Sequence, residues 1–132
     1  MIALPYAADG VGLVVAPQGS DGCRVASVID GDTVTLWCPE TGWERTRLLG
    51  FDTPEKFSPG CVGEFTAALK AEWALRRAIL DATELRVEMG RLDRFERRLA
   101  SLMLDGQDVA NLMIASGHAR AYQGGLREGW CT

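Results

Sequence analysis

The stretch CRVASVIDGDTVTLWC, residues 23–38, decides the fold. At its centre, Asp30-Gly31 predicts a two-residue hairpin turn of type I′, which needs positive φ at both positions. On either side of the turn, residues of β-branched and apolar type recur at the two-residue spacing of a strand with one buried face. We therefore expect a β-hairpin whose apolar face packs against the core.

The register of this hairpin follows if Ile29 and Asp32 flank the turn. The facing pairs are then Val25 with Leu36, Ser27 with Val34, and Cys23 with Cys38. The opposite and more exposed face carries Arg24, Thr33, Thr35 and Trp37. Asp32 points to the core side at the very end of the ribbon, where a carboxylate needs a partner or a metal ion.

The rest of the chain predicts three more strands and two helices. The strands are expected at 45–51, 84–89 and 98–104, and the helices at 62–80 and 108–117. In the first helix, the large apolar residues near helical spacing are Phe65, Leu69, Trp73 and Leu80. The second helix has Asp108 as its candidate N-cap and Gly117 in the C′ position.

The order of these elements predicts a mainly β protein. Five short strands, with a helix between the third and fourth and a short C-terminal helix, fit a five-stranded OB-fold barrel. A split sheet of α+β type is the alternative. We expect one domain over residues 1–132, with an N-terminal arm at 1–22, a core at 23–119 and an irregular tail at 120–132.

Composition narrows the functional classes only slightly. The 132 residues carry a net charge of −4, which counts mildly against a general nucleic-acid binder. Of the 14 basic residues only Lys56 and Lys70 are lysines. The other residues are arginines, whose planar guanidinium group binds phosphate bidentately better than a lysine does. No apolar run approaches the roughly 20 residues of a membrane helix, and no signal peptide is visible at the start of the chain.

The four cysteines form no CxxC pair, so a zinc site is a weak interpretation. They are Cys23, Cys38, Cys61 and Cys131. Three disulfide pairings are possible, and an even count fits an oxidising compartment. Four unpaired buried thiols are the alternative.

Charged residues at three strand ends suggest phosphodiester chemistry. Asp32 and Asp52 supply the oxygen ligands that a hard cation prefers. Arg47 and Arg97 match a phosphate group bidentately, and Glu55 is suited to orient or deprotonate a water molecule. Each feature alone has a simpler interpretation as a turn residue, a structural ion pair or a solvated charge run. Together they are the parts of an in-line hydrolysis.

Three segments resemble the staphylococcal nuclease (thermonuclease) family: VIDGDTVTL, TRLLGFDTPE and DRFERRLASLMLDGQDVANLMIASGHA. They occur in the family's order with similar spacing, over residues 28–119. The resemblance implies an OB-type barrel and calcium-dependent cleavage of DNA and RNA. Matched position by position, Asp32 and Asp52 correspond to the calcium-binding carboxylates, and Thr53 to the residue that adds a backbone carbonyl.

The resemblance also implies the catalytic residues. Glu55 matches the family's proposed general base, and Arg47 and Arg97 match the arginines that contact the scissile phosphate. Water attacks phosphorus, the 5′ oxygen leaves, and the products carry 3′-phosphates. The alternatives are a non-catalytic OB module that binds nucleic acid or a protein, and a phosphodiesterase acting on a small nucleotide. We expect a monomer.

The chain departs from the family at one motif. Phe95 and Glu96 stand where members usually have Tyr-Gly, which removes a hydroxyl group and adds a negative charge beside Arg97. Tyr122 aligns loosely with a substrate-side tyrosine. The only histidine, His118, has no role in the family, and a capping or surface position is expected.

Short bacterial members often carry paired cysteines and end in Trp-Cys, as Trp130-Cys131 does here. On that likeness we expect the pairs Cys23–Cys38 and Cys61–Cys131. A secreted or periplasmic location fits such pairs.

Overall fold

The computed structural model describes residues 19, 21–125 and 127–131. Most of the N-terminal arm expected at 1–22 therefore lies outside the described residues. The elements in chain order are β1 (Arg24–Asp30), β2 (Thr33–Cys38), β3 (Gly42–Leu48), β4 (Gly50–Asp52), α1 (Val62–Asp81), β5 (Leu85–Leu92), β6 (Arg98–Leu104), β7 (Gln107–Asp108), α2 (Val109–Ala115) and β8 (Arg120–Tyr122).

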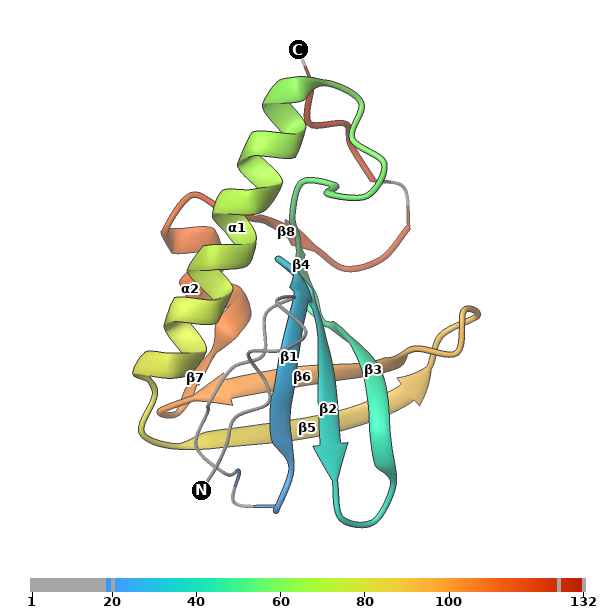
Figure 1. Ribbon diagram of the computed structural model, residues 1–132, viewed down its shortest axis with the longest axis vertical. Helices are drawn as coiled ribbons and strands as arrows, with labels where there is room; N and C mark the ends of the chain where they lie inside the picture. The colour runs from blue at the N-terminus through green and yellow to red at the C-terminus, as the bar shows by residue number, and fades with distance from the viewer. Residues whose placement is uncertain (1–18, 20, 126, 132) are drawn as a thin grey trace.

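Five of the strands form one curved sheet in the order β1-β2-β3-β6-β5, and β7 pairs with β6. The β3–β6 pairing is parallel and the others are antiparallel. Figure 1 shows β5 and β6 crossing β1, β2 and β3 at a steep angle, with α1 and α2 together on one side. The expected mainly β fold, an OB-type barrel with two helices, is confirmed.

The first hairpin forms, but its expected register is only partly right. Val25 faces Leu36 as predicted, whereas the pair predicted for Ser27 and Val34 is wrong. Irregularities on either side of Val28 shift the pairing, so that Ser27 faces Thr35 and Val28 faces Val34. The shift has a packing reason, since it brings two valines with no solvent exposure together on the core face.

The turn of this hairpin also differs from the expectation. Asp30 pairs with Thr33, so Gly31 and Asp32 form the turn, and none of these residues has a positive φ. The turn is therefore not of type I′. Asp32 nevertheless points inward as predicted, with only 7% of its surface exposed. Thr33, expected on the more exposed face, is also buried.

The strand expected at 45–51 is divided into two. β3 ends at Leu48, and β4 begins at Gly50, whose φ of 97° is accessible mainly to glycine. This break releases the chain from the main sheet, and β4 pairs instead with β8 in a second small sheet. The tail from residue 120 is therefore not wholly irregular, because β8 positions Asp52 at the end of β4 opposite Arg120.

Helix α1 forms close to its predicted bounds, but the residues that it turns to the core are not its large apolar ones. The large apolar residues at helical spacing are exposed, and Trp73 is 64% exposed. The buried face consists of Glu64, Ala68, Ala71, Glu72, Leu75 and Ile79. Small alanines allow the helix to lie close to the barrel, and this close approach decides which face is buried.

The second helix and its caps are confirmed. The side chain of Asp108 accepts a hydrogen bond from the backbone N–H of Ala110 at 2.9 Å. Gly117 has a φ of 84°, and its N–H donates to the carbonyl of Ile114. Neither helix in the described part of the chain is long and apolar enough to cross a membrane.

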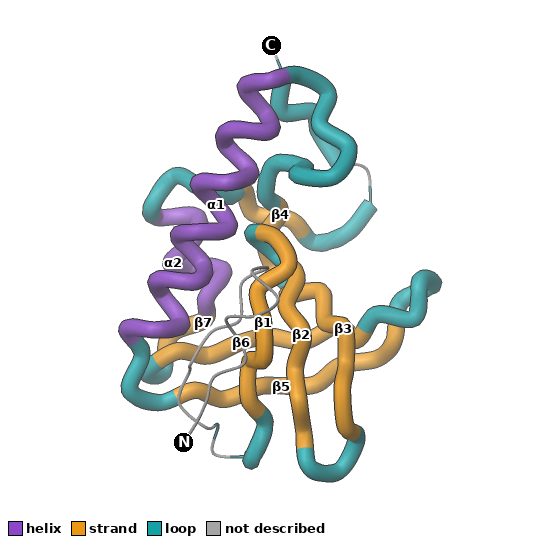
Figure 2. The backbone as a smooth tube through the Cα atoms, viewed as in Figure 1, coloured by secondary structure: helices purple, strands orange, loops and turns teal. Residues whose placement is uncertain are grey.

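Both expected disulfides are present. Cys23–Cys38 joins β1 to β2 with its Cα atoms 4.1 Å apart. Cys61–Cys131, with Cα atoms 6.2 Å apart, ties the C-terminal tail to the residue that precedes α1. Figure 2 shows the resulting loop of tail beside the N-terminal end of α1.

Gly31 is predicted to be sensitive to substitution. A Cβ atom there would lie 2.8 Å from the Ala71 Cβ and 2.8 Å from the Thr53 Oγ1. We expect Gly31→Ala to lower the free energy of unfolding by about 1–3 kcal/mol, because the hairpin turn and α1 must separate. Urea denaturation measures the change. The matched control is Gly63→Ala in α1, where a Cβ meets no atom within 4 Å and stability should not fall. Equal stability of both variants would contradict the close approach.

Candidate active site

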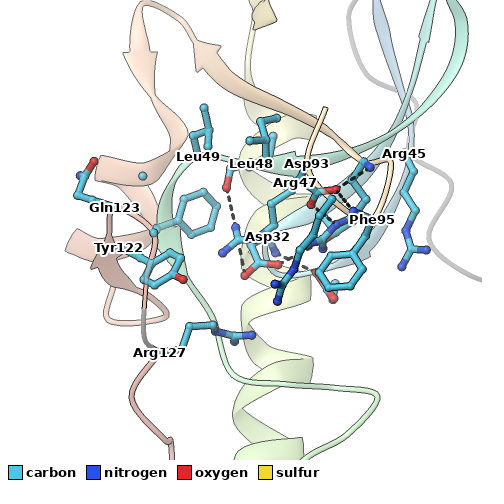
Figure 3. A pocket seen from close by; sticks show the side chains of 18 of the residues that line it. Asp32, Arg45, Arg47, Leu48, Leu49, Asp93, Phe95, Tyr122, Gln123 and Arg127 are labelled. Carbon is cyan, nitrogen blue, oxygen red and sulfur yellow. Dashed lines mark hydrogen bonds and ion pairs between the residues drawn. The ribbon is translucent and has the colours of Figure 1, made fainter. Parts of the chain in front are cut away.

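Four of the predicted site residues line one cavity of about 790 Å³. They are Asp32, Arg47, Glu55 and Arg97, which come from the hairpin turn, β3, the loop before α1 and the β5–β6 turn. Figure 3 shows Asp32 between the rings of Tyr122 and Phe95, which also line the cavity. The other two predicted residues, Asp52 and Thr53, are buried next to the cavity and are not part of its lining.

The carboxylates of Asp32 and Asp52 converge on Arg47. The Arg47 Nη1 atom lies 3.4 Å from Asp32 Oδ2, and its Nη2 atom lies 3.8 Å from Asp52 Oδ1. Asp32 Oδ2 also accepts a hydrogen bond from the backbone N–H of Thr53 at 3.2 Å. Arg47 Nη1 donates to the carbonyl of Leu48 at 2.6 Å, which fixes the guanidinium beside both carboxylates.

The loop that carries Glu55 is anchored to α1 by two buried glutamates. Glu64 accepts hydrogen bonds from the backbone N–H groups of Glu55 at 2.9 Å and Gly60 at 2.7 Å. The hydrogen bond from Gly60, and after it the one from Glu55, lower the pKa of the Glu64 carboxyl. Glu72 forms an ion pair with Lys56, the residue after Glu55. Neither glutamate was among the site residues predicted from the sequence.

Arg97 is held by Asp93 at the base of the β5–β6 turn. Asp93 accepts hydrogen bonds from the backbone N–H and the Nε of Arg97, both at 2.9 Å, and from the N–H of Phe95. Desolvation opposes ionisation of Asp93, but these bonds and the charge of Arg97 prevail and lower its pKa. The Arg97 guanidinium therefore has a fixed position at the cavity wall.

The two residues that depart from the family lie on different sides of this turn. Phe95 lines the cavity, and its ring lies 5.7 Å from the Arg97 guanidinium carbon. Glu96 is exposed and is not among the lining residues. Its φ is 64°, a left-handed value that favours glycine over a residue with a Cβ atom.

The tail contributes residues that sequence reasoning missed. Arg127 Nη2 lies 2.6 Å from Asp52 Oδ1, and Trp130 Nε1 donates to Asp52 Oδ2 at 3.3 Å. Burial tends to lower the pKa of Arg127, but its close contact with Asp52 and the negative charges around it raise that pKa. Tyr122, aligned loosely from sequence, lies with its ring 5.9 Å from the Arg47 guanidinium carbon. His118 lines a separate pocket beside α1.

The donor atoms at the site suit calcium, although they are few. The Asp32 and Asp52 carboxylates and the Thr53 carbonyl offer hard oxygen donors. Asp52 Oδ1 is buried with no well-aligned hydrogen bond despite its ion pair with Arg127. Within the described residues, no group of three or more His, Cys, Asp or Glu side chains is placed to hold a metal ion. A calcium ion there would complete its six to eight ligands with water or substrate oxygens.

The sequence profile described as "Staphylococcal nuclease homologue" matches residues 45–128, which is more than half of the chain. The chain belongs to this family. No match was found among curated proteins. Members of the family are typically nucleases and generally depend on calcium. The cavity therefore lies in a fold that is typical of nucleases.

The pKa of Asp30 predicts a pH dependence of stability in this nuclease homologue. Burial, and then the charge of the neighbouring Asp32, raise the Asp30 pKa from 3.8 to about 7. Between these values the unfolded chain is ionised at this position and the folded chain is protonated, so stability should fall as pH rises. Asp30→Asn should remove that fall.

Urea denaturation of wild type and Asp30→Asn at pH 5 and pH 8, in the presence of a chelator, checks this expectation. The variant should gain stability relative to wild type at the higher pH. Asp81→Asn, at an exposed carboxyl at the end of α1, is the control. Parallel pH profiles for all three proteins would show that Asp30 titrates normally.

Glu96→Gly is expected to stabilise the nuclease homologue by about 1 kcal/mol, since a non-glycine residue in the left-handed region is strained. Thermal denaturation measures this gain. Glu96→Gln is the matched control, because it removes the same charge and retains the Cβ atom. A gain in both variants would assign the effect to the charge instead of the backbone.

Proposed function

We propose that this chain is a calcium-dependent nuclease that hydrolyses phosphodiester bonds in DNA, RNA or both. The observation that carries the proposal is the convergence of Asp32, Arg47, Glu55 and Arg97, from four separate segments, on one cavity. Two arginines and a carboxylate that line one cavity can hold a phosphate and an attacking water molecule.

Each of these side chains has a defined role in the proposed reaction. Arg47 and Arg97 hold the non-bridging oxygens of the scissile phosphate and balance the charge that develops on them. Glu55 accepts a proton from water as the new bond to phosphorus forms. The bond from phosphorus to the 5′ oxygen breaks, and the leaving oxygen takes a proton from solvent. A calcium ion held by Asp32, Asp52 and the Thr53 carbonyl would supply Lewis-acid polarisation of the phosphate.

Local charge supports a polyanionic substrate despite the net charge of −4. Six arginines line the cavity: Arg45, Arg47, Arg91, Arg94, Arg97 and Arg127. Phe95 is 64% exposed beside them, and an exposed ring next to a basic surface suits base stacking. These features favour a nucleic acid chain over a small nucleotide. The two disulfides are compatible with a secreted or periplasmic location.

The proposal is tested by hydrolysis of single-stranded DNA and RNA by wild type and Arg97→Ala, each with calcium and with a chelator. We expect calcium-dependent cleavage, reduced on the order of 100-fold or more in the variant because a transition-state contact is lost. Arg86→Ala, at an exposed arginine on β5, is the matched control and should retain activity.

Equal activity in all reactions would contradict the mechanism. Absence of hydrolysis, together with binding of single-stranded DNA that weakens steeply with salt, would favour a non-catalytic nucleic-acid-binding module.

A further inference from the structure

Arg127 contacts three of the groups to which the proposed function gives roles. Its Nη2 atom lies 2.6 Å from Asp52 Oδ1 and 3.4 Å from the Thr53 carbonyl oxygen. Its Nη1 atom lies 3.6 Å from Glu55 Oε2. The first two oxygens are the proposed calcium donors from β4 and the following loop, and the third belongs to the proposed base. One guanidinium therefore lies where a bound cation and an attacking water would be needed.

The tail that carries Arg127 is fastened independently of this contact. Trp130 donates to Asp52 Oδ2, and the Arg120 guanidinium carbon lies 3.6 Å above the Trp130 ring. Arg120 also donates to the backbone carbonyls of Glu128 and Gly129. Beyond Trp130, the Cys61–Cys131 disulfide holds the end of the described tail. The Arg127 side chain itself is 37% exposed, so it has a path into solvent that leaves the tail in place.

Charge balance explains why the arginine and a divalent cation exclude each other. The Asp52 side chain is only 4% exposed, and a buried carboxylate requires a compensating cation. Arg127 provides it at 2.6 Å, whereas Arg47 is more distant at 3.8 Å. A divalent ion bound to Asp52 Oδ1 would be in direct repulsion with a guanidinium at the same oxygen. One of the two positive groups has to leave.

We propose that Arg127 is a built-in competitor for the divalent cation and thereby sets the calcium affinity of the site. In the cation-free state its guanidinium compensates Asp52 and contacts Glu55. When calcium binds, the side chain moves toward solvent, and Glu55 is released together with the Thr53 carbonyl. This inference rests on the calcium site of the proposed function and adds a residue that opposes its occupation.

The test is the calcium dissociation constant, measured directly by isothermal titration calorimetry in the absence of substrate. We expect Arg127→Ala to bind calcium about tenfold or more tightly than wild type, because the competing cation is gone. Arg45→Ala is the matched control: it removes one arginine from the same cavity, but no ion pair within the described residues joins Arg45 to Asp32, Asp52 or Glu55. Its calcium affinity should change by less than about threefold.

Thermal denaturation with chelator and with calcium provides a second readout. Without calcium, Arg127→Ala should unfold at a lower temperature than wild type, since Asp52 loses its nearest cation. With calcium, the variant should gain more stability than wild type, by linkage between binding and folding. A purely structural role would lower both values equally and leave the dissociation constant unchanged. Arg127→Gln, which also removes the charge, should show the same pattern. Agreement between the two variants would exclude a folding defect that is specific to the alanine substitution.

The outcomes separate this inference from the proposed function. Calcium binding to wild type that is unchanged or weakened in Arg127→Ala would overturn the competition and leave the nuclease proposal standing. Failure of both proteins to bind calcium at millimolar concentration would overturn both.

Discussion

The buried carboxylate of Asp52 is the constraint around which the site is organised. It lies at the end of β4, where the chain leaves the main sheet at Gly50 and pairs with β8. A charge so well shielded from solvent must be balanced by groups brought from elsewhere. Arg47 comes from β3, and Arg127 comes from the tail with Trp130. Compensation of one carboxylate thus joins the barrel and the C-terminal tail.

Two further buried carboxylates, on helix α1, hold the loop that carries Glu55. Glu64 and Glu72 lie on the face of α1 that the alanines bring close to the barrel. Their hydrogen bonds to Glu55, Gly60 and Lys56 hold the loop before α1 against the helix. Because this loop carries Glu55, the alanine-lined contact of α1 helps to position the candidate site as well as to build the core.

The sequence predicted the features that depend on local chemistry. The α2 caps at Asp108 and Gly117, the bounds of α1 and the β6 strand all follow from residue type and spacing. The predictions from the sequence were wrong where contacts between distant segments decide the structure. The volume available beside the barrel decides which face of α1 is buried. The small alanines fit there, whereas the large apolar side chains at helical spacing do not. A signal was present, since Glu64 and Glu72 share a helical face with Ala68 and Ala71.

By itself, the sequence determined the mainly β class, the order of the longer strands and the two helices, and four of the residues that line the cavity. These features could be predicted because they depend on motifs and spacings that are local in the chain. Only the tertiary structure decided the register beyond Val25, the break of the third strand and the presence of Arg127 at Asp52. These depend on burial and on charge balance between segments far apart in sequence. Pairs of this kind, 75 positions apart in the case of Asp52 and Arg127, leave no periodic or spacing signal in a single chain.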